Sequence, residues 1–468
     1  MNKTLKKFLQ FSIGPITTAL FGLVLIPLTT YFVVPKEFGR ASMFMLAQTL
    51  MQSFLYLGFD QAYAREFHQE KRKNRLMYHA MFFPLILSFL VILSFFIFTN
   101  QLSYLLFGGP NYYLAVYLTG INGIFIVIER FLLLRLQMEE RALEFSIKSI
   151  LTKSAVLIFT LIFLLFIRQD FLAIVYSTIV GQMLSGLILF IWHKSYLKPD
   201  AYQLDWKLIK RMFSFGFPII FSAGLWSIIT TFDKIALRIW SDFEQLGFFT
   251  AVMRIVVLLM IIQTAFTSFY LPVAYRWHEE KKDMKYYKMV SDSILAVLSI
   301  GFILLLIFNP LLMLLLAEEY RQARYLLGFL TMQPIFYTLS ETTTLGIVFT
   351  KKTYYNFIVM ILAVVPSVGL NMLLIPNYGA LGAAIGTGIA YLVFFWARTY
   401  FSFRVWKGFK VRKHFVLTVM ILVLSVINIF DEAWVLVVNI FALLMVFFIN
   451  LKTFKSLLST IKNKTKNK

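Results

Sequence analysis

Apolar stretches long enough to cross a membrane recur along the whole chain, and this feature constrains the fold more than any other. A hydrocarbon core about 30 Å thick takes roughly 20 residues of α-helix. Hydrophobic residues make up 59% of the 468 positions and charged residues only 15%. A chain of this composition cannot cover its surface for water, so most of its solvent is lipid. The sequence therefore predicts an all-α polytopic membrane protein.

Charged residues and Pro, Gly and Asn bound these stretches and predict about fourteen transmembrane helices. The predicted spans are 8–34, 41–64, 78–98, 111–137, 145–166, 171–192, 213–240, 246–274, 288–316, 324–350, 355–376, 380–400, 414–430 and 433–450.

The distribution of Lys and Arg agrees with this number. With both termini in the cytoplasm, the segments on the cytoplasmic side hold 35 of the 45 basic residues, the outer segments hold 5 and the spans hold the other 5. Cytoplasmic loops of membrane proteins are enriched in Lys and Arg. The net charge of +22 is then a consequence of topology. No nucleic-acid partner is expected, because a basic binding groove needs a soluble domain and the predicted spans leave no room for one.

An internal repeat predicts how the spans are organised. Phe11-Ser12-Ile13-Gly14-Pro15 and Phe213-Ser214-Phe215-Gly216-Phe217-Pro218 each follow a basic pair and open a span. Two six-helix bundles, 1–200 and 205–405, would both enter and leave on the cytoplasmic side, as parallel repeats do in transporters that rock one half against the other. Two extra transmembrane helices, 410–450, and a basic cytoplasmic tail, 451–468, follow them.

Several kinds of chemistry are not expected. The chain has no cysteine, which excludes disulfides and thiolate ligands. None of its five histidines has a second ligand at metal spacing. No G-x-x-x-x-G-K-[ST] motif occurs, so no bound ATP is expected. The sequence predicts no cofactor, no metal and no catalytic residue.

Three segments carry a resemblance to a known family. They are Leu57-Gly58-Phe59-Asp60 with Arg65, Asp233-Lys234 with Leu246-Gly247-Phe248 and Arg254, and Leu370-Asn371 with Leu374-Ile375-Pro376-Asn377-Tyr378-Gly379-Ala380-Leu381-Gly382-Ala383-Ala384-Ile385. These segments resemble parts of the second, the seventh and eighth, and the eleventh and twelfth spans of polysaccharide exporters in the multidrug/oligosaccharidyl-lipid/polysaccharide superfamily. The length and the number of spans suit the Wzx-type flippases of the polysaccharide transporter family.

This resemblance implies a function and a location. The expected activity is the transfer of a polyprenyl-pyrophosphate-linked oligosaccharide from the inner to the outer leaflet of the bacterial cytoplasmic membrane, by alternating access, for cell-surface polysaccharide synthesis. The expected partners are that lipid-linked oligosaccharide, membrane lipids and other polysaccharide-assembly proteins.

Three alternatives stay open. A drug exporter of the same superfamily is expected to carry a cation-coupling acid in its first span, and residues 8–34 contain none. A flippase of peptidoglycan precursor lipids differs too little in length and motifs from a flippase of lipid-linked oligosaccharides for this sequence to separate the two. A membrane enzyme of the same glycans needs a substantial outer loop with catalytic residues, whereas the predicted outer loops are short.

Charged side chains within spans are costly in lipid and are therefore candidates for function. One face of the seventh span is polar along its length and holds Ser222, Trp226, Thr230 and Asp233. Trp226 is suited to stack on a sugar ring, and Asp233 or Lys234 to contact its hydroxyls or a phosphate. Lys234 and Arg254 of the eighth span lie at matching depths. The competing interpretation is an ion pair between Asp233 and Arg254 that holds the two spans together.

The fourth and fifth spans contain further candidates. Asn122 and Glu129 share a helical face, with Arg130 next to Glu129, and Lys153 lies at a similar depth. Arg130 and Lys153 are suited to receive a pyrophosphate from the cytoplasmic side. The alternatives are snorkelling to inner-leaflet headgroups and a network between Glu129 and Arg130.

Glu341 in the tenth span, with Glu129, is the candidate for coupling to an ion gradient. An isolated carboxyl in lipid can exchange a proton during transport. The competing interpretation is an ion pair between Glu341 and a base from another helix. Asp60, at the inner end of the second span, is interpreted as structural.

Overall fold

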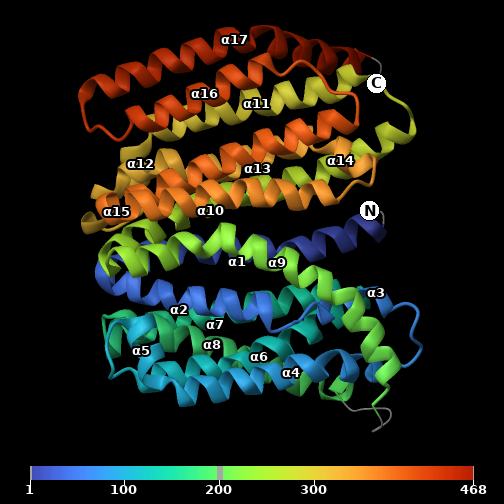
Figure 1. The fold of residues 1–468 in the computed structure, drawn as a ribbon, viewed down its shortest axis with the longest axis vertical. Helices are drawn as coiled ribbons and strands as arrows, with labels where there is room; N and C mark the ends of the chain where they lie inside the picture. The colour runs from blue at the N-terminus through green and yellow to red at the C-terminus, as the bar shows by residue number, and fades with distance from the viewer. Residues whose placement is uncertain (1–2, 198–203, 467–468) are drawn as a thin grey trace. The chain divides into compact units, whose positions relative to one another are not determined.

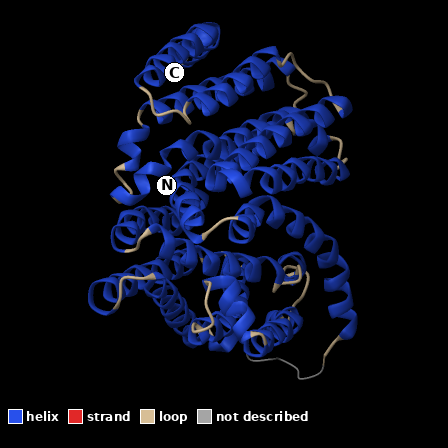
Figure 2. Ribbon diagram, turned by 60° about the vertical axis from the view of Figure 1, so that its left-hand side comes forward, coloured by secondary structure: helices blue, strands red, loops and turns tan. Residues whose placement is uncertain are grey.

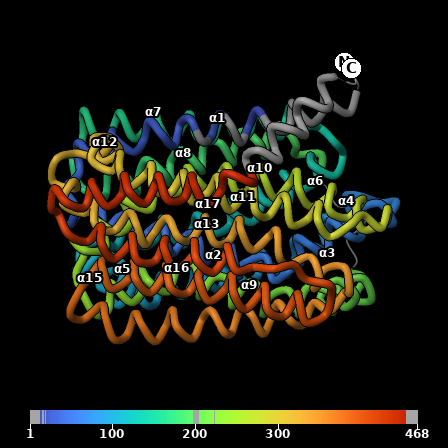
Figure 3. Tube along the Cα trace, turned by 90° about the horizontal axis from the view of Figure 1, so that it is seen from above, coloured from blue at the N-terminus to red at the C-terminus, as the bar shows by residue number. Residues whose placement is uncertain are grey.

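The structure is a computed structural model that describes residues 3–197 and 204–466, and helices make up nearly all of this part of the chain (Figures 1 and 2). No strand occurs among these residues. The chain forms two compact units, Met1–Ile228 and Ile229–Lys468. Most helices of each unit run roughly along one direction (Figure 3).

The first unit begins with α1 (Lys3–Phe32), α2 (Pro35–Phe54), α3 (Phe59–Glu66), α4 (Lys73–Ile97) and α5 (Thr99–Phe107). It continues with α6 (Tyr113–Met138), α7 (Ala142–Ile162), the π-helical turn η1 (Phe163–Ile167), α8 (Phe171–Trp192), the short 3-10 helix η2 (Lys194–Leu197) and the first part of α9 (Trp206–Trp240).

The second unit contains the rest of α9, α10 (Phe243–Glu279), α11 (Met284–Ile307), α12 (Asn309–Met313) and the 3-10 helix η3 (Glu318–Leu326). It ends with α13 (Leu327–Thr343), α14 (Leu345–Phe349), α15 (Tyr354–Val405), α16 (Arg412–Ile427) and α17 (Ala433–Lys466). The two units meet inside α9, whereas the predicted bundle boundary lies at 200–205, of which 200–203 fall outside the described residues. The two six-helix repeats stay a prediction.

All fourteen predicted spans overlap helices of the structure, so the all-α membrane fold is confirmed. Within the described residues, nine helices are long and apolar enough to cross a membrane. One of them, α15, is two helices joined at Gly379, whose φ of 49° and ψ of −126° are not helical. That kink is the predicted turn between the eleventh and twelfth spans. The total number of crossings stays a prediction.

The second predicted span is broken, although it was expected to be continuous over 41–64. Leu57 (φ 48°) and Gly58 (φ 69°) adopt the left-handed conformation between α2 and α3. Gly58 also approaches α9, because a Cβ added there would lie 2.5 Å from the carbonyl oxygen of Gly216. Both the backbone conformation and the close approach require glycine at this position.

Gly58→Ala is therefore expected to lower the free energy of unfolding by at least about 1–2 kcal/mol, the cost of a left-handed L-residue. Gly22→Ala is the matched control, because a Cβ at Gly22 in α1 would meet nothing within 4 Å. Thermal unfolding in detergent compares the two variants. Equal stabilities would show that Gly58 does not hold a constrained backbone.

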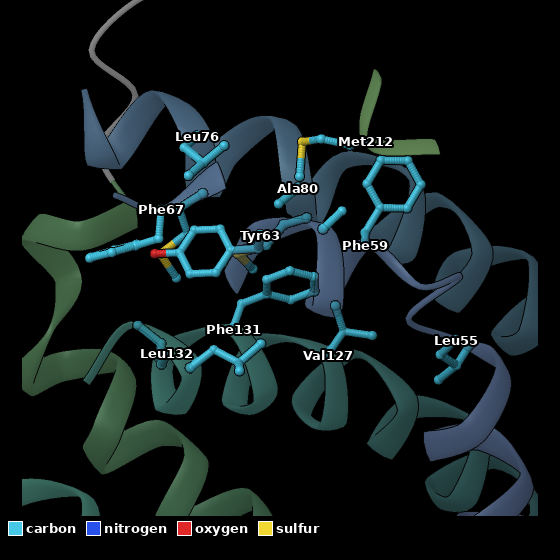
Figure 4. Close-up of a cluster of buried hydrophobic side chains, with 14 of the residues drawn as sticks. Leu55, Phe59, Tyr63, Phe67, Leu76, Ala80, Val127, Phe131, Leu132 and Met212 are labelled. Atoms are coloured by element: carbon cyan, nitrogen blue, oxygen red, sulfur yellow. The ribbon is translucent and has the colours of Figure 1, made fainter. Parts of the chain in front are cut away.

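An aromatic cluster forms the core of the first unit at the inner end of the predicted second span (Figure 4). Phe59 and Tyr63 of α3 lie against Phe131 of α6 and Met212 of α9, and all four side chains are fully buried. The rings of Tyr63 and Phe131 are 6.0 Å apart in an edge-on arrangement. The short helix after the break thus positions the side chains between α4, α6 and α9.

In the first unit, polar contacts join segments that are predicted to lie on the same side of the membrane. At one end, Arg135 of α6 donates to Oδ1 of Asn74 at the start of α4, 2.6 Å away. At the same end, Arg75 lies 2.6 Å from Asp205, before α9. Backbone N–H groups, chiefly that of Leu208, keep the pKa of Asp205 below its ordinary value. The grouping agrees with the predicted alternation of sides.

The predicted orientation can be measured with single cysteines in this cysteine-free chain. An impermeant thiol reagent added outside is expected to label cysteines at Asn100, Asn377 and Asp431. Cysteines at Lys73, Lys281 and Lys410 are expected to stay unlabelled, because they belong to the segments rich in Lys and Arg. Reversal of two or more of these six results would contradict the fourteen-span arrangement.

Candidate functional site

A polar cluster lies inside the second unit, where α9 meets α15. Asp233 is 3% exposed, and its Oδ2 accepts a hydrogen bond from Oγ1 of Thr387, 3.0 Å away. Its other oxygen, Oδ1, has no hydrogen-bond partner among the described residues. Lys234 follows on α9 and interacts electrostatically with both Asp233 and Arg254 of α10. The structure therefore brings three of the predicted site residues together.

Two tyrosines extend this cluster. Tyr391 of α15 interacts electrostatically with Asp233, and its hydroxyl accepts a hydrogen bond from Gln333 of α13 at 3.0 Å. Tyr320 of η3 interacts with Arg254. Burial raises the pKa of the Tyr320 hydroxyl above its ordinary range, so this residue stays a neutral hydrogen-bonding group. Sequence analysis did not find these partners, because they come from helices far along the chain.

The formal charge of the cluster is positive. Asp233 contributes one negative charge, and Lys234 and Arg254 contribute two positive charges. The helices that carry them, α9 and α10, are both long and apolar enough to cross a membrane. A net positive charge in such surroundings attracts an anion, because little water is present to screen it.

In the first unit, Arg130 forms an ion pair with Asp60. Its Nη2 is 2.6 Å from Oδ2 of Asp60, and its Nε is 3.2 Å from the same oxygen. Its guanidinium also lies 5.6 Å from the ring centre of Tyr56. The side chain of Arg130 nevertheless stays 35% exposed, so part of it is open to a further ligand.

Glu129 contacts Lys148 of α7, and the Lys148 side chain is only 4% exposed. Lys148 was not singled out from the sequence, where it lies near the start of the predicted span 145–166. Lys153 is exposed on α7 and interacts electrostatically with Lys148. The ionic partner of Glu129 is thus Lys148, whereas Arg130, the partner named for Glu129 from the sequence, pairs with Asp60.

Asn122 belongs to a buried amide cluster. Its Nδ2 donates to Oε1 of Gln182 at 2.8 Å, and Nε2 of Gln48 donates to the same oxygen at 2.8 Å. Asn122 is fully buried. Gln48 and Gln182 were not found from the sequence, although a glutamine within an apolar span is the signal that could have found them.

Glu341 forms the ion pair that was its competing interpretation. Nη1 of Arg398 on α15 lies 2.6 Å from Oε1 of Glu341 on α13 and 2.8 Å from Oγ of Ser340. The Arg398 and Glu341 side chains are 14% and 8% exposed. Arg398 lies near the end of the predicted span 380–400 and was not named from the sequence as the partner of Glu341. The coupling role of Glu341 stays a prediction.

Trp226 lies in the part of α9 that belongs to the first unit and is 37% exposed. Asp233 lies two turns further on in the part of α9 that belongs to the second unit. The side chain of Ser222 lies outside those that the structure describes.

The fold defines a class of protein, the all-α polytopic membrane proteins. The chain superposes on the lipid II flippase MurJ in an inward closed conformation with a TM-score of 0.73 and 17% identity, over 96% of this chain and 99% of the flippase. It superposes on an inward-facing multidrug resistance transporter of the MATE family, of the MOP superfamily, with a TM-score of 0.65 and 16% identity, over 85% and 98% of the two chains. At these identities the likeness shows the fold alone.

The family is shown by the sequence comparison. Residues 4–278 match the family described as polysaccharide biosynthesis protein, and this is more than half of the chain. The protein therefore belongs to that family. The capsular polysaccharide biosynthesis protein CapF of Staphylococcus aureus is 24% identical over 200 residues, which are 42% of this chain and 50% of that relative. The resemblance to polysaccharide exporters is confirmed.

Proposed function

We propose that the protein is a flippase that moves a polyprenyl-pyrophosphate-linked oligosaccharide from the inner to the outer leaflet of a bacterial cytoplasmic membrane. Both termini face the cytoplasm in this proposal. The observation that carries it is the positively charged cluster of Asp233, Lys234 and Arg254 inside an apolar bundle, in a chain of a polysaccharide biosynthesis family.

The chemistry of the substrate explains why such a cluster is needed. A pyrophosphate cannot cross about 30 Å of hydrocarbon without cationic partners. Arg130, with Lys153 on the neighbouring α7, offers cations at the predicted inner leaflet. Lys234 and Arg254 offer cations in the predicted outer half. Alternating access passes the headgroup from one pair to the other, while the lipid tail stays in the bilayer.

The remaining proposed contacts concern the sugars and the driving force. Trp226 is half-exposed and is suited to stack on a sugar ring. Asn122 donates a hydrogen bond to Gln182 within the amide cluster. Its proposed role is to position either the sugar or the helices that surround the sugar. Glu341 and Glu129 are the proposed ion-coupling residues, each held by a base that must release it for a proton or a sodium ion to bind.

Mass spectrometry of lipids that copurify with the protein tests this proposal. A polyprenyl pyrophosphate that carries a glycan is expected, and its amount is expected to fall in Arg254→Ala. Arg238→Ala is the matched control, since Arg238 is also an arginine of the second unit but its guanidinium lies over the ring of Phe243. Recovery of an organic cation in its place would identify a drug exporter, and recovery of a peptide-bearing precursor would identify a flippase of peptidoglycan intermediates.

A further inference from the structure

A second buried polar cluster lies in the second unit, where α11, α13 and α16 pack side by side (Figure 1). His414, in the first turn of α16, is fully buried. Its Nε2 lies 2.8 Å from Oγ of Ser291 on α11, and Ser291 Oγ lies 2.7 Å from Oγ1 of Thr342 on α13. Thr342 Oγ1 in turn donates to the carbonyl oxygen of Leu339 at 2.7 Å. Neither the proposed transport path nor the family comparison uses these residues.

The number of protons in this chain of contacts determines the tautomer of His414. The carbonyl of Leu339 can only accept, so the single hydroxyl proton of Thr342 is used there. Ser291 must then donate its hydroxyl proton to Oγ1 of Thr342. The contact between Ser291 and His414 needs a third proton, which only the imidazole can supply. The ring therefore carries its proton on Nε2, and its Nδ1 is a bare acceptor.

That bare nitrogen faces another acceptor. His414 Nδ1 lies 3.9 Å from Oδ1 of Asp292 on α11. Both atoms are buried, and neither has a hydrogen-bond partner among the described residues. The other oxygen of Asp292 is bound by Lys288. Two buried acceptors that face each other are unfavourable, and one proton between them would satisfy both.

We infer that Nδ1 of His414 is a proton-binding site and that the bound proton ties α16 to α11 through Asp292. Protonation turns Nδ1 into a donor, and a shift of about 1 Å closes the gap to the length of a charge-assisted hydrogen bond. Burial of the ring is the largest effect and opposes the proton, Asp292 favours it, and Lys288 and Lys413, the other charged groups around the ring, oppose it. Lys413, next to His414 in the chain, donates a hydrogen bond to Thr453 of α17 at 2.8 Å.

This inference goes beyond the proposed function and needs no transport assay. We expect solid-state nitrogen NMR of the full-length protein in lipid bilayers, with labelled histidine, to show it. His414→Asn identifies the signals of His414 among the five histidines. At about pH 8 the ring is expected to carry one proton, on Nε2, and between about pH 8 and pH 4 it is expected to gain the second on Nδ1.

Two variants separate this site from an ordinary buried histidine. Asp292→Asn is expected to lower the titration midpoint of His414 by roughly one pH unit or more. Ser291→Ala removes the acceptor of Nε2, so the proton of the neutral ring is expected to move to Nδ1, opposite Asp292. Ser299→Ala is the matched control, because Ser299 is also buried on α11 and should leave the spectrum unchanged. A proton on Nδ1 at about pH 8 in the wild type, or no titration down to about pH 4, would overturn the inference.

Discussion

Arg254→Ala is expected to abolish or sharply reduce flipping in a reconstituted assay. In the proposed function Arg254 and Lys234 receive the pyrophosphate in the outer half of the membrane. Loss of one charge-assisted hydrogen-bonding group costs about 1.5–3 kcal/mol, which is roughly a ten- to hundredfold loss of affinity. Arg254→Lys keeps the charge but not the planar fork, so it is expected to recover part of the activity. Arg130→Ala is expected to weaken binding from the cytoplasmic side.

Substitution of Asp233 tests whether Arg254 contacts a ligand or only forms a structural ion pair. The structure gives Asp233 a hydrogen bond from Thr387 and the neighbouring charge of Lys234. If Arg254 served only to neutralise Asp233, removal of both charges would restore folding and activity. Protein level and flipping are therefore measured for Arg254→Ala, Asp233→Ala and the double variant, with Arg238→Ala as the control cation. Full activity in the double variant would refute a phosphate role for Arg254.

Arg398→Ala is expected to produce the largest loss of stability. This change leaves the carboxylate of Glu341, 8% exposed, without its base inside the bundle. Removal of one partner of a buried ion pair typically costs about 3–5 kcal/mol. Glu341→Gln with Arg398→Gln removes both charges and is expected to regain most of that loss. Thermal unfolding in detergent measures all of these variants.

The same pair tests the coupling proposal. Glu341→Gln is expected to leave the protein inserted but to remove the dependence of flipping on a proton or sodium gradient, because the amide cannot titrate. A comparison at matched protein level separates this effect from instability. Flipping that still follows the gradient in Glu341→Gln would leave Glu341 with a structural role alone. Equal stability of Arg398→Ala and the wild type would instead show that the buried pair does not hold α13 to α15.

The buried partners show where sequence reasoning reached its limit. Lys148 and Arg398 lie near the ends of predicted spans, and neither was named from the sequence as the partner of a buried acid. In the structure they pair with Glu129 and Glu341 on neighbouring helices, which compensate their charge. Hydropathy treats each residue alone, so it does not identify a base that is neutralised by an acid on another helix. Asp60, by contrast, was interpreted as structural and binds Arg130.

The sequence by itself determined that the chain is a helical membrane protein, where its apolar helices lie, and that the chain turns at Gly379. These properties depend on local composition, since a helix in lipid satisfies its own backbone and needs only a sufficient length of apolar residues. Only the tertiary structure decided which buried charges meet, where α2 breaks from α3, and that the division into units falls inside α9. Those properties depend on which helices face each other. That choice rests on packing and charge pairing between residues tens to more than a hundred positions apart, which hydropathy and charge along a single chain do not encode.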